Sequence, residues 1–222
     1  MPPIVVFDLD GTLVDTAPDL IASLNAALAR EGMAAVDVDA FRPFAGRGGR
    51  VMIETAYARA GRPLGEPLFS ALHATFVDHY RESMPGTSRL FDGGLGALDR
   101  LAADGWALAI CTNKPEDLAL RLIDRMGLTA RFAAIAGSDT YPYKKPDPRH
   151  LLSTIDRAGG DPERAVMVGD TVTDIDAAKA AGVPVVGVDF GYSDTPVLSL
   201  EPSAAIGHFD ALTPELLRRL LS

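Results

Sequence analysis

The sequence predicts an α/β fold, a doubly wound parallel sheet core that carries an inserted helical domain. Short apolar runs alternate with helical patterns along most of the chain. These runs are almost continuously apolar, as expected for parallel strands that helices cover on both faces. About 90 residues separate the first run from the second, far more than a strand-to-helix connection requires.

Five segments are predicted to be strands of this sheet: residues 4–8, 107–111, 132–136, 165–169 and 184–188. Residues 115–126 and 173–181 place apolar side chains at helical spacing. A glycine follows each of them, Gly127 and Gly182, which is typical of the end of a helix. Strands that alternate with helices in this way predict a sheet whose strands run in parallel.

The long interval after the first strand predicts a small helical domain at residues 16–82. Its amphipathic segments are residues 18–31, 49–60 and 66–82. The core domain is then formed by residues 1–15 and 83–222. The tail, from residue 195, contains three prolines and is expected to be a loop followed by a closing helix near 213–221.

Composition narrows the possible partners. The 222-residue chain is 47% hydrophobic and has a formal net charge of −9. Nucleic acids and anionic membranes are bound by clustered Lys and Arg, so we expect neither, and a small molecule is the expected partner. The single cysteine, Cys111, excludes an internal disulfide. No signal peptide and no apolar stretch near ~18 residues is evident, so a cytoplasmic location is expected.

Polar side chains follow the predicted strands where each strand ends. Asp8, Asp10 and Thr12 follow the first strand, and Thr112 and Asn113 follow the second. Lys145 lies in the loop after the third, and Asp170 and Asp174 follow the fourth. Ligands of doubly wound sheets bind at the carboxyl ends of the strands, so these side chains are expected to converge there.

Three converging carboxylates require a cation if all of them are to stay ionised. Mg²⁺ is the expected ion, because it takes few protein oxygens together with phosphate, whereas Ca²⁺ needs 6–8 oxygen ligands. An EF-hand loop does not fit, since its first position would be Val6. Zinc is not expected either, because the lone cysteine and four scattered histidines have no ligand spacing, and the histidines are interpreted as surface or packing residues.

Four motifs in order resemble those of haloacid dehalogenase superfamily phosphatases, and more narrowly of the phosphoglycolate phosphatase group. They are DLDGTLVDT from Asp8, CTNK from Cys111, KKPDP from Lys144 and VGDTVTDIDAAKAAG from Val168. The resemblance spans essentially the whole chain, and the helical insertion resembles the cap of that family. It implies a phosphoric monoester hydrolase that acts on a small phosphorylated metabolite, 2-phosphoglycolate or a similar ester.

The resemblance also implies roles for individual residues. Asp8 would be the nucleophile that forms an aspartyl-phosphate, and Asp10 the general acid and base. Mg²⁺ would be held by the Asp8 carboxylate, the Asp10 carbonyl and Asp170, with Asp174 acting through water or a neighbour. The remaining roles are phosphoryl binding by Thr112, charge balance by Lys145, and substrate-binding or supporting roles for Thr12 and Asn113.

Substrate choice is expected to depend on the cap. Its segment Phe44–Arg50 combines glycines with Arg47 and Arg50 at the start of a predicted helix, an arrangement suited to an anionic group. The resemblance places Arg50 against the non-phosphate end of the substrate, and a solvated, flexible loop is the alternative. Either a monomer or a homodimer is compatible with the sequence.

Several alternatives stay open. A sugar-phosphate phosphatase or a phosphomutase of the same superfamily shares most of these motifs, although the mutases usually carry an acidic residue where this chain has Gly169. Dehalogenases lack the acid at the position of Asp10, and phosphonatases differ at residues 112–114. From another class, a receiver-type signalling domain also clusters acids, Thr and Lys, but it is shorter and phosphorylates an Asp after a middle strand.

Overall fold

The computed structural model describes residues 1–222 and divides them into two compact units. The core unit comprises Met1–Asp15 and Leu90–Ser222, and the helical unit comprises Thr16–Arg89. The core unit has the predicted α/β fold, with a Rossmann-like sheet of six strands. The fold class predicted from the sequence is therefore confirmed.

The core sheet has the strand order β5-β4-β1-β6-β7-β8, and the strand pairs between β1 and its neighbours are parallel. The strands are β1 Ile4–Phe7, β4 Ala107–Cys111, β5 Ala134–Ala136, β6 Ala165–Gly169, β7 Val185–Val188 and β8 Ala204–Ile206. Val5 lies opposite Leu108 on one side and Val166 on the other. Because β1, β4 and β6 are in register, the residues that follow them emerge at one edge of the sheet.

The last strand, β8, was not predicted. It has only three residues, two of them alanines, so it gives no apolar run in the tail that was expected to be a loop. It pairs in parallel with β7 through Val186 and Ala204. The closing helix, α9, spans Pro214–Leu220 close to its predicted place.

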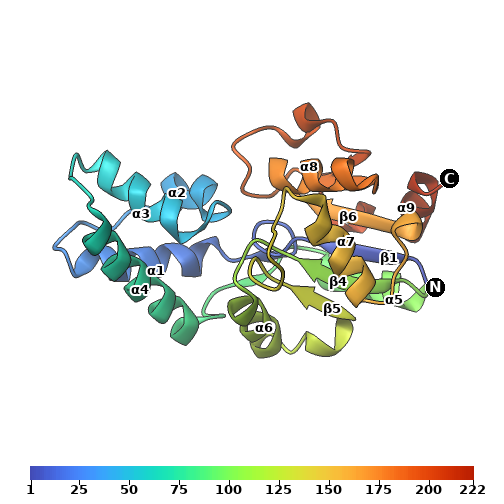
Figure 1. Cartoon of the computed structure of the whole chain (residues 1–222), viewed down its shortest axis with the longest axis horizontal. Coiled ribbons are helices and arrows are strands. Elements are labelled where there is room, and N and C mark those ends of the chain that lie inside the picture. Colours follow the sequence, from blue (N-terminus) through green and yellow to red (C-terminus); the bar gives the residue numbers. More distant parts are fainter. The chain divides into compact units, whose positions relative to one another are not determined.

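Helices α7 and α8 cover one face of the core sheet (Figure 1). The helices of this unit are α5 Gly94–Ala103, α6 Glu116–Arg125, α7 Pro148–Arg157, α8 Val172–Ala181 and α9 Pro214–Leu220. Leu151 and Ile155 of α7 join Ile175 of α8 in one buried cluster with Ile4 and Met167 of the sheet. Since alternate strand residues point to opposite faces, Val5 and Val166 lie on the other face and are equally buried.

The helical unit contains four helices, not the three that were predicted (Figure 1). They are α1 Ala17–Ala29, α2 Val38–Ala45, α3 Gly48–Arg59 and α4 Glu66–Ser83. Helix α2 was missed because it has only two turns and contains Pro43, which usually ends a helix. Asp37 begins it by accepting a hydrogen bond from the backbone N–H of Ala40 at 3.0 Å.

Asp19, in the first turn of α1, joins the beginning of the helical unit to its end. Its carboxylate accepts hydrogen bonds from the backbone N–H and the hydroxyl of both Thr87 and Ser88, at 2.5–3.0 Å. A buried carboxylate needs such donors. These four bonds explain why the unit extends to Arg89, past the boundary expected at residue 82.

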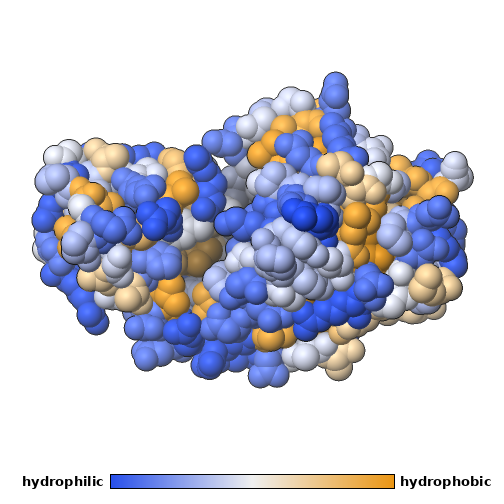
Figure 2. All heavy atoms as spheres, viewed as in Figure 1, coloured by the Kyte–Doolittle hydropathy of each residue, from blue (hydrophilic) through white to orange (hydrophobic).

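The two connections between the units run through the short strands β2 (Val14–Asp15) and β3 (Arg89–Leu90), which pair with each other. Hydrophilic side chains cover much of the face shown in Figure 2, with smaller apolar areas between them. The exposed large apolar side chains lie on separate segments: Met1, Leu95, Leu120, Val172 and Leu198. None of the helices has both the length and the apolar character needed to span a bilayer.

Candidate active site

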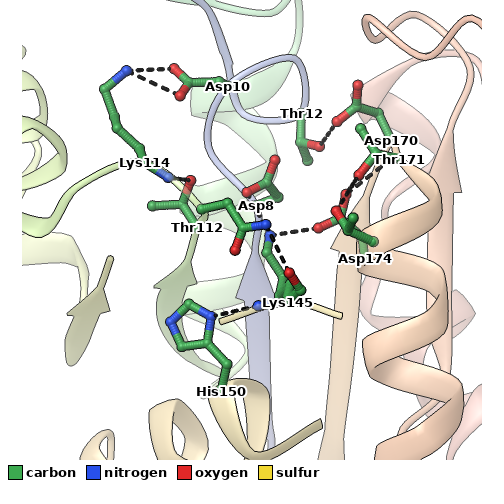
Figure 3. Close-up of polar contacts among 12 residues, drawn as sticks. Asp8, Asp10, Thr12, Thr112, Lys114, Lys145, His150, Asp170, Thr171 and Asp174 are labelled. Carbon is green, nitrogen blue, oxygen red and sulfur yellow. Dashed lines mark hydrogen bonds and ion pairs between the residues drawn. The ribbon is translucent and has the colours of Figure 1, made fainter. Parts of the chain in front are cut away.

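Asp8 follows β1 directly and continues the sheet by one residue. Its backbone N–H donates to the carbonyl oxygen of Val168 in β6 at 2.9 Å. Its carboxylate accepts a hydrogen bond from the ammonium group of Lys145 at 2.7 Å, and only 7% of the residue is exposed. A buried carboxylate is thereby held by a cation at the carboxyl end of the central strand (Figure 3).

Lys145 joins Asp8 to Asp174. Its Nζ donates to Asp174 at 2.5 Å, while the other Asp174 oxygen accepts from the backbone N–H and hydroxyl of Thr171 at the start of α8. Burial alone would lower the pKa of Lys145, but the charges of Asp174 and Asp8 outweigh it and the pKa rises. Lys145 therefore stays charged over the whole physiological range.

Asp170 follows β6 and is completely buried. Its oxygens accept hydrogen bonds from the Thr12 hydroxyl at 2.7 Å and from the backbone N–H of Tyr192 at 2.8 Å. Gly11 is required beside it: its φ is +88°, and a Cβ there would lie 2.8 Å from an Asp170 oxygen. The turn Asp10–Thr12 can approach Asp170 closely because position 11 has no side chain.

Carboxylate oxygens of Asp8, Asp170 and Asp174 all lie within 4.8 Å of one another. Burial raises the pKa of Asp170, and the charges of Asp174 and Asp8 raise it further. Burial raises the pKa of Asp8 as well, and Lys145 partly offsets this. Since the Lys145 ammonium group contacts only two of these three buried acids, the donor set fits a hard divalent cation that takes oxygen ligands.

The Asp10 carboxylate points away from this cluster and faces Lys114 (Figure 3). The Lys114 ammonium lies 2.9 and 3.0 Å from the two Asp10 oxygens, and its side chain is only 4% exposed. The backbone N–H of Lys114 also donates to the Thr112 hydroxyl oxygen at 3.2 Å. Lys114 thus fixes two of the expected site residues, although it was not itself among them.

Asn113 and His150 hold the backbone of Lys145. The Asn113 side-chain amide donates to the Lys145 carbonyl at 2.9 Å, and the Lys145 N–H donates to His150 Nδ1 at 3.2 Å. His150 Nε2 lies 3.0 Å from the carbonyl oxygen of Gly137, just past β5. Because Nδ1 accepts, the neutral ring must carry its proton on Nε2 and donate it to Gly137. His150 is the packing histidine of this site.

The neutral state of His150 gives a pH-dependent stability. Burial and the Lys145 charge lower its pKa to about 4. A base whose pKa is lowered by folding stabilises the native state above its unfolded pKa of about 6.5, and this contribution is lost as the pH falls towards 4. His150→Gln cannot titrate. We expect the difference in unfolding free energy between the wild type and this variant to shrink by about 3 kcal/mol from pH 7 to pH 4.

Urea titrations of both proteins across this range measure that difference. Other acids titrate equally in the two proteins and cancel. A difference that does not depend on pH would show that folding leaves the pKa of His150 unchanged.

Gly169 bears on the phosphomutase alternative. A Cβ at this position would lie 2.3 Å from the Cβ of Asp174, so the observed packing leaves no room for a side chain. Asp174 in turn holds Lys145. An acidic residue at position 169 would require the Asp174 side chain to move.

Arg50 lies in the helical unit, in the first turn of α3. Its guanidinium lies 3.3 Å from Glu54 and 3.9 Å from the ring centre of Phe69. Arg47 is the residue that precedes this helix. The contact of either arginine with substrate stays a prediction.

The structure brings most of the expected residues together within the core unit. Lys145 joins Asp8 to Asp174, Thr12 contacts Asp170, and the three carboxylates lie within 4.8 Å of one another. Lys114 joins Asp10 to Thr112. Tyr192 was missed, although its place just past β7, at the same sheet edge, is the signal that could have found it. Its hydroxyl donates to Asp15 at 2.6 Å.

Residues 5–188 match the model of a family described as haloacid dehalogenase-like hydrolase. The chain belongs to this family. The resemblance read from the four motifs is thereby confirmed, and this member of the family is an enzyme, a hydrolase of the phosphatase type. The hydrolase motifs fall on the strand ends that form the site.

The chain is similar over its whole length to two proteins named phosphoglycolate phosphatase. That of Mesorhizobium japonicum is 58% identical, over 99% of this chain and 96% of its own. That of Agrobacterium fabrum is 50% identical, over 99% and 94%. The crystal structure of a predicted phosphoglycolate phosphatase from Haemophilus somnus matches with a TM-score of 0.86 at 31% identity, over 93% of this chain and 94% of that one.

Proposed function

We propose that this hydrolase cleaves small phosphate monoesters, with 2-phosphoglycolate as the preferred substrate, through a phosphorylated Asp8. The observation that carries the proposal is the buried Asp8 carboxylate, held by Lys145 within 4.8 Å of Asp170 and Asp174. The names of the two relatives described above support the choice of substrate.

In the first step an Asp8 oxygen attacks phosphorus while the bond to the leaving oxygen breaks. Asp10 gives its proton to that oxygen, which leaves as an alcohol. Asp10 reaches the leaving group by turning from the position in which Lys114 holds it. In the second step Asp10 takes a proton from water, the water oxygen bonds to phosphorus, and the carboxylate of Asp8 is released with inorganic phosphate.

The neighbours of Asp8 stabilise the charge that gathers in these steps. Thr112 accepts a hydrogen bond from the Lys114 N–H, so its own hydroxyl proton is available to a phosphoryl oxygen. Lys145 stays charged and lies 2.7 Å from Asp8, so it offsets the negative charge of the phosphoryl group. Asn113 and His150 keep Lys145 in place through its backbone.

Asp8 and Asp170 would hold Mg²⁺, together with the main-chain carbonyl of Asp10, and Asp174 would support them through Lys145 and Thr171. When bound, the ion supplies positive charge to the phosphoryl oxygens and lowers the repulsion between Asp8 and the substrate. The pKa of Asp170 is raised, as expected for a buried acid whose ionised form needs a cation beside it. A bound cation would lower the pKa of Asp170 and favour its ionised form.

A panel of esters assayed with and without Mg²⁺ tests the proposal. It contains 2-phosphoglycolate, a hexose phosphate, glycerol phosphate and para-nitrophenyl phosphate. We expect EDTA to lower every rate by at least about 100-fold, Mg²⁺ to restore it, and 2-phosphoglycolate to have the highest kcat/KM. Asp170→Ala should need far more Mg²⁺ for half-maximal activity, because it removes a direct carboxylate ligand.

Two outcomes would contradict the proposal in different ways. Full activity in EDTA would show that no metal ion is needed, and would favour the metal-independent chemistry of the dehalogenase alternative. A hexose phosphate as the best substrate would favour the sugar-phosphate phosphatase alternative while leaving the phosphatase mechanism in place.

A further inference from the structure

We propose that Lys114 recognises a carboxylate on the leaving group, and so gives the enzyme its preference for phosphate esters of small hydroxy acids. The inference rests on the proposed function in one respect, the role of Asp10 as the acid that protonates the leaving oxygen. It concerns a residue of the core unit that neither the motifs nor the mechanism above places against substrate.

The position of Lys114 follows from that of Asp10. A general acid must lie within hydrogen-bond distance, about 2.6–3.2 Å, of the oxygen it protonates. The Lys114 ammonium is 2.9 and 3.0 Å from the two oxygens of that acid. Asp10 turns from Lys114 to reach the leaving oxygen, so that oxygen lies within reach of the Asp10 side chain and Lys114 borders the region in which the leaving group sits. In 2-phosphoglycolate a single methylene separates the bridging oxygen from the carboxylate, so a carboxylate there comes within reach of the ammonium.

The two buried lysines contact different acids of the site. Lys145 contacts Asp8 and Asp174 and serves the phosphoryl end. Lys114 contacts Asp10, apart from the cluster of Asp8, Asp170 and Asp174 (Figure 3). The side chains of both are almost fully buried. A buried ammonium group attracts an anion much more strongly than one in water.

An anionic leaving group needs such a cation in this protein. The net charge is −9, and four of the carboxylates that contribute to it lie at the site: Asp8, Asp10, Asp170 and Asp174. An acidic protein can bind an anion only where a local positive charge outweighs this field. When Asp10 turns to the leaving oxygen, the substrate carboxylate takes its place beside Lys114, so the ammonium remains paired throughout the reaction.

Lys114→Met tests the inference with two esters that differ by one oxygen atom in size. 2-Phosphoglycolate ends in a carboxylate, and 2-hydroxyethyl phosphate ends in a neutral alcohol. An effect of Lys114 through Asp10 changes both esters alike, whereas the loss of a carboxylate contact changes their ratio. We expect the ratio of kcat/KM values, 2-phosphoglycolate over 2-hydroxyethyl phosphate, to fall about 10- to 100-fold. The Kd of the product glycolate should rise by a similar factor, and direct binding gives a measurement that needs no turnover.

The matched control is Lys144→Met, which removes the same charge from an exposed lysine. It should leave the ratio within about twofold, because exposed charges are screened. Lys114→Gln keeps hydrogen-bond donors for Asp10 without the charge, and is the second variant if Met impairs folding. It should lower the ratio in the same way.

Arg50→Ala distinguishes this inference from the expectation, made from the sequence, that Arg50 contacts the non-phosphate end of the substrate. If Arg50 binds the carboxylate, the ratio falls in Arg50→Ala and stays unchanged in Lys114→Met, and the inference is overturned. Equal losses on both esters in Lys114→Met would also overturn it, and would leave Lys114 as a residue that only positions Asp10. If the wild type itself shows no preference for the carboxylate ester, the substrate part of the proposed function fails, and the Lys114 inference fails with it. A wild-type preference for the carboxylate ester that survives in Lys114→Met is a different result, because it contradicts the Lys114 inference alone.

Discussion

Asp8→Asn is expected to lower kcat by at least about 1000-fold on every phosphate ester, with the fold intact. The amide has the size of the carboxylate but no anionic oxygen to attack phosphorus. No phosphoenzyme should be trapped by rapid acid quench and mass spectrometry of the variant, whereas the wild type should gain one phosphate on the peptide that contains Asp8.

The stability of this variant is the control for the loss of activity. Burial raises the pKa of Asp8 in the folded chain, so its ionised form costs stability as the pH rises above the unfolded value near 4. The amide removes this cost, and Lys145 keeps its 2.5 Å contact with Asp174. In the absence of metal, Tm at pH 7 should therefore equal or exceed that of the wild type. Wild-type turnover by Asp8→Asn would disprove a covalent mechanism at this residue.

The strand ends were predictable because parallel strands in register bring their carboxyl ends to one sheet edge. Asp8 and Asp170 each follow a strand that reads as one apolar run, and the structure places their carboxylates in one cluster. Helix α8 was equally clear, since Gly182 ends it in a left-handed conformation. These features depend on local sequence and on a general rule of sheet geometry.

Contacts that depend on side-chain direction were not predictable. The alternation of side chains in an extended strand would point Asp8 and Asp10 the same way. The chain turns at Gly11, and the Asp10 carboxylate pairs with Lys114, 104 positions along the sequence. The contact of His150 with Lys145 was not predictable either, because one histidine in a helix looks the same in sequence whether it only packs in the core or also holds the backbone of a buried lysine.

Asp10→Asn is expected to impair hydrolysis in a way that depends on the leaving group. General acid catalysis contributes about 100- to 10,000-fold when the leaving group is a poor one such as an alkoxide. We expect a kcat/KM loss in this range for 2-phosphoglycolate. para-Nitrophenolate leaves without a proton, so the first step with para-nitrophenyl phosphate should lose much less. The Asp8 carboxylate, held by Lys145, is unchanged as the nucleophile.

The second step still needs a base to activate water, and the amide introduced by Asp10→Asn cannot act as one. The variant should therefore release a burst of para-nitrophenol, about one equivalent per site, followed by a slow steady rate while phosphate stays on Asp8. Stopped-flow absorbance measures the burst, and acid quench measures the trapped phosphate. Asp10→Ala is the matched control for loss of the Lys114 contact, because both substitutions remove that ion pair. If the losses on the two esters are equal and no burst occurs, Asp10 is not the acid, and its contact with Lys114 has another purpose.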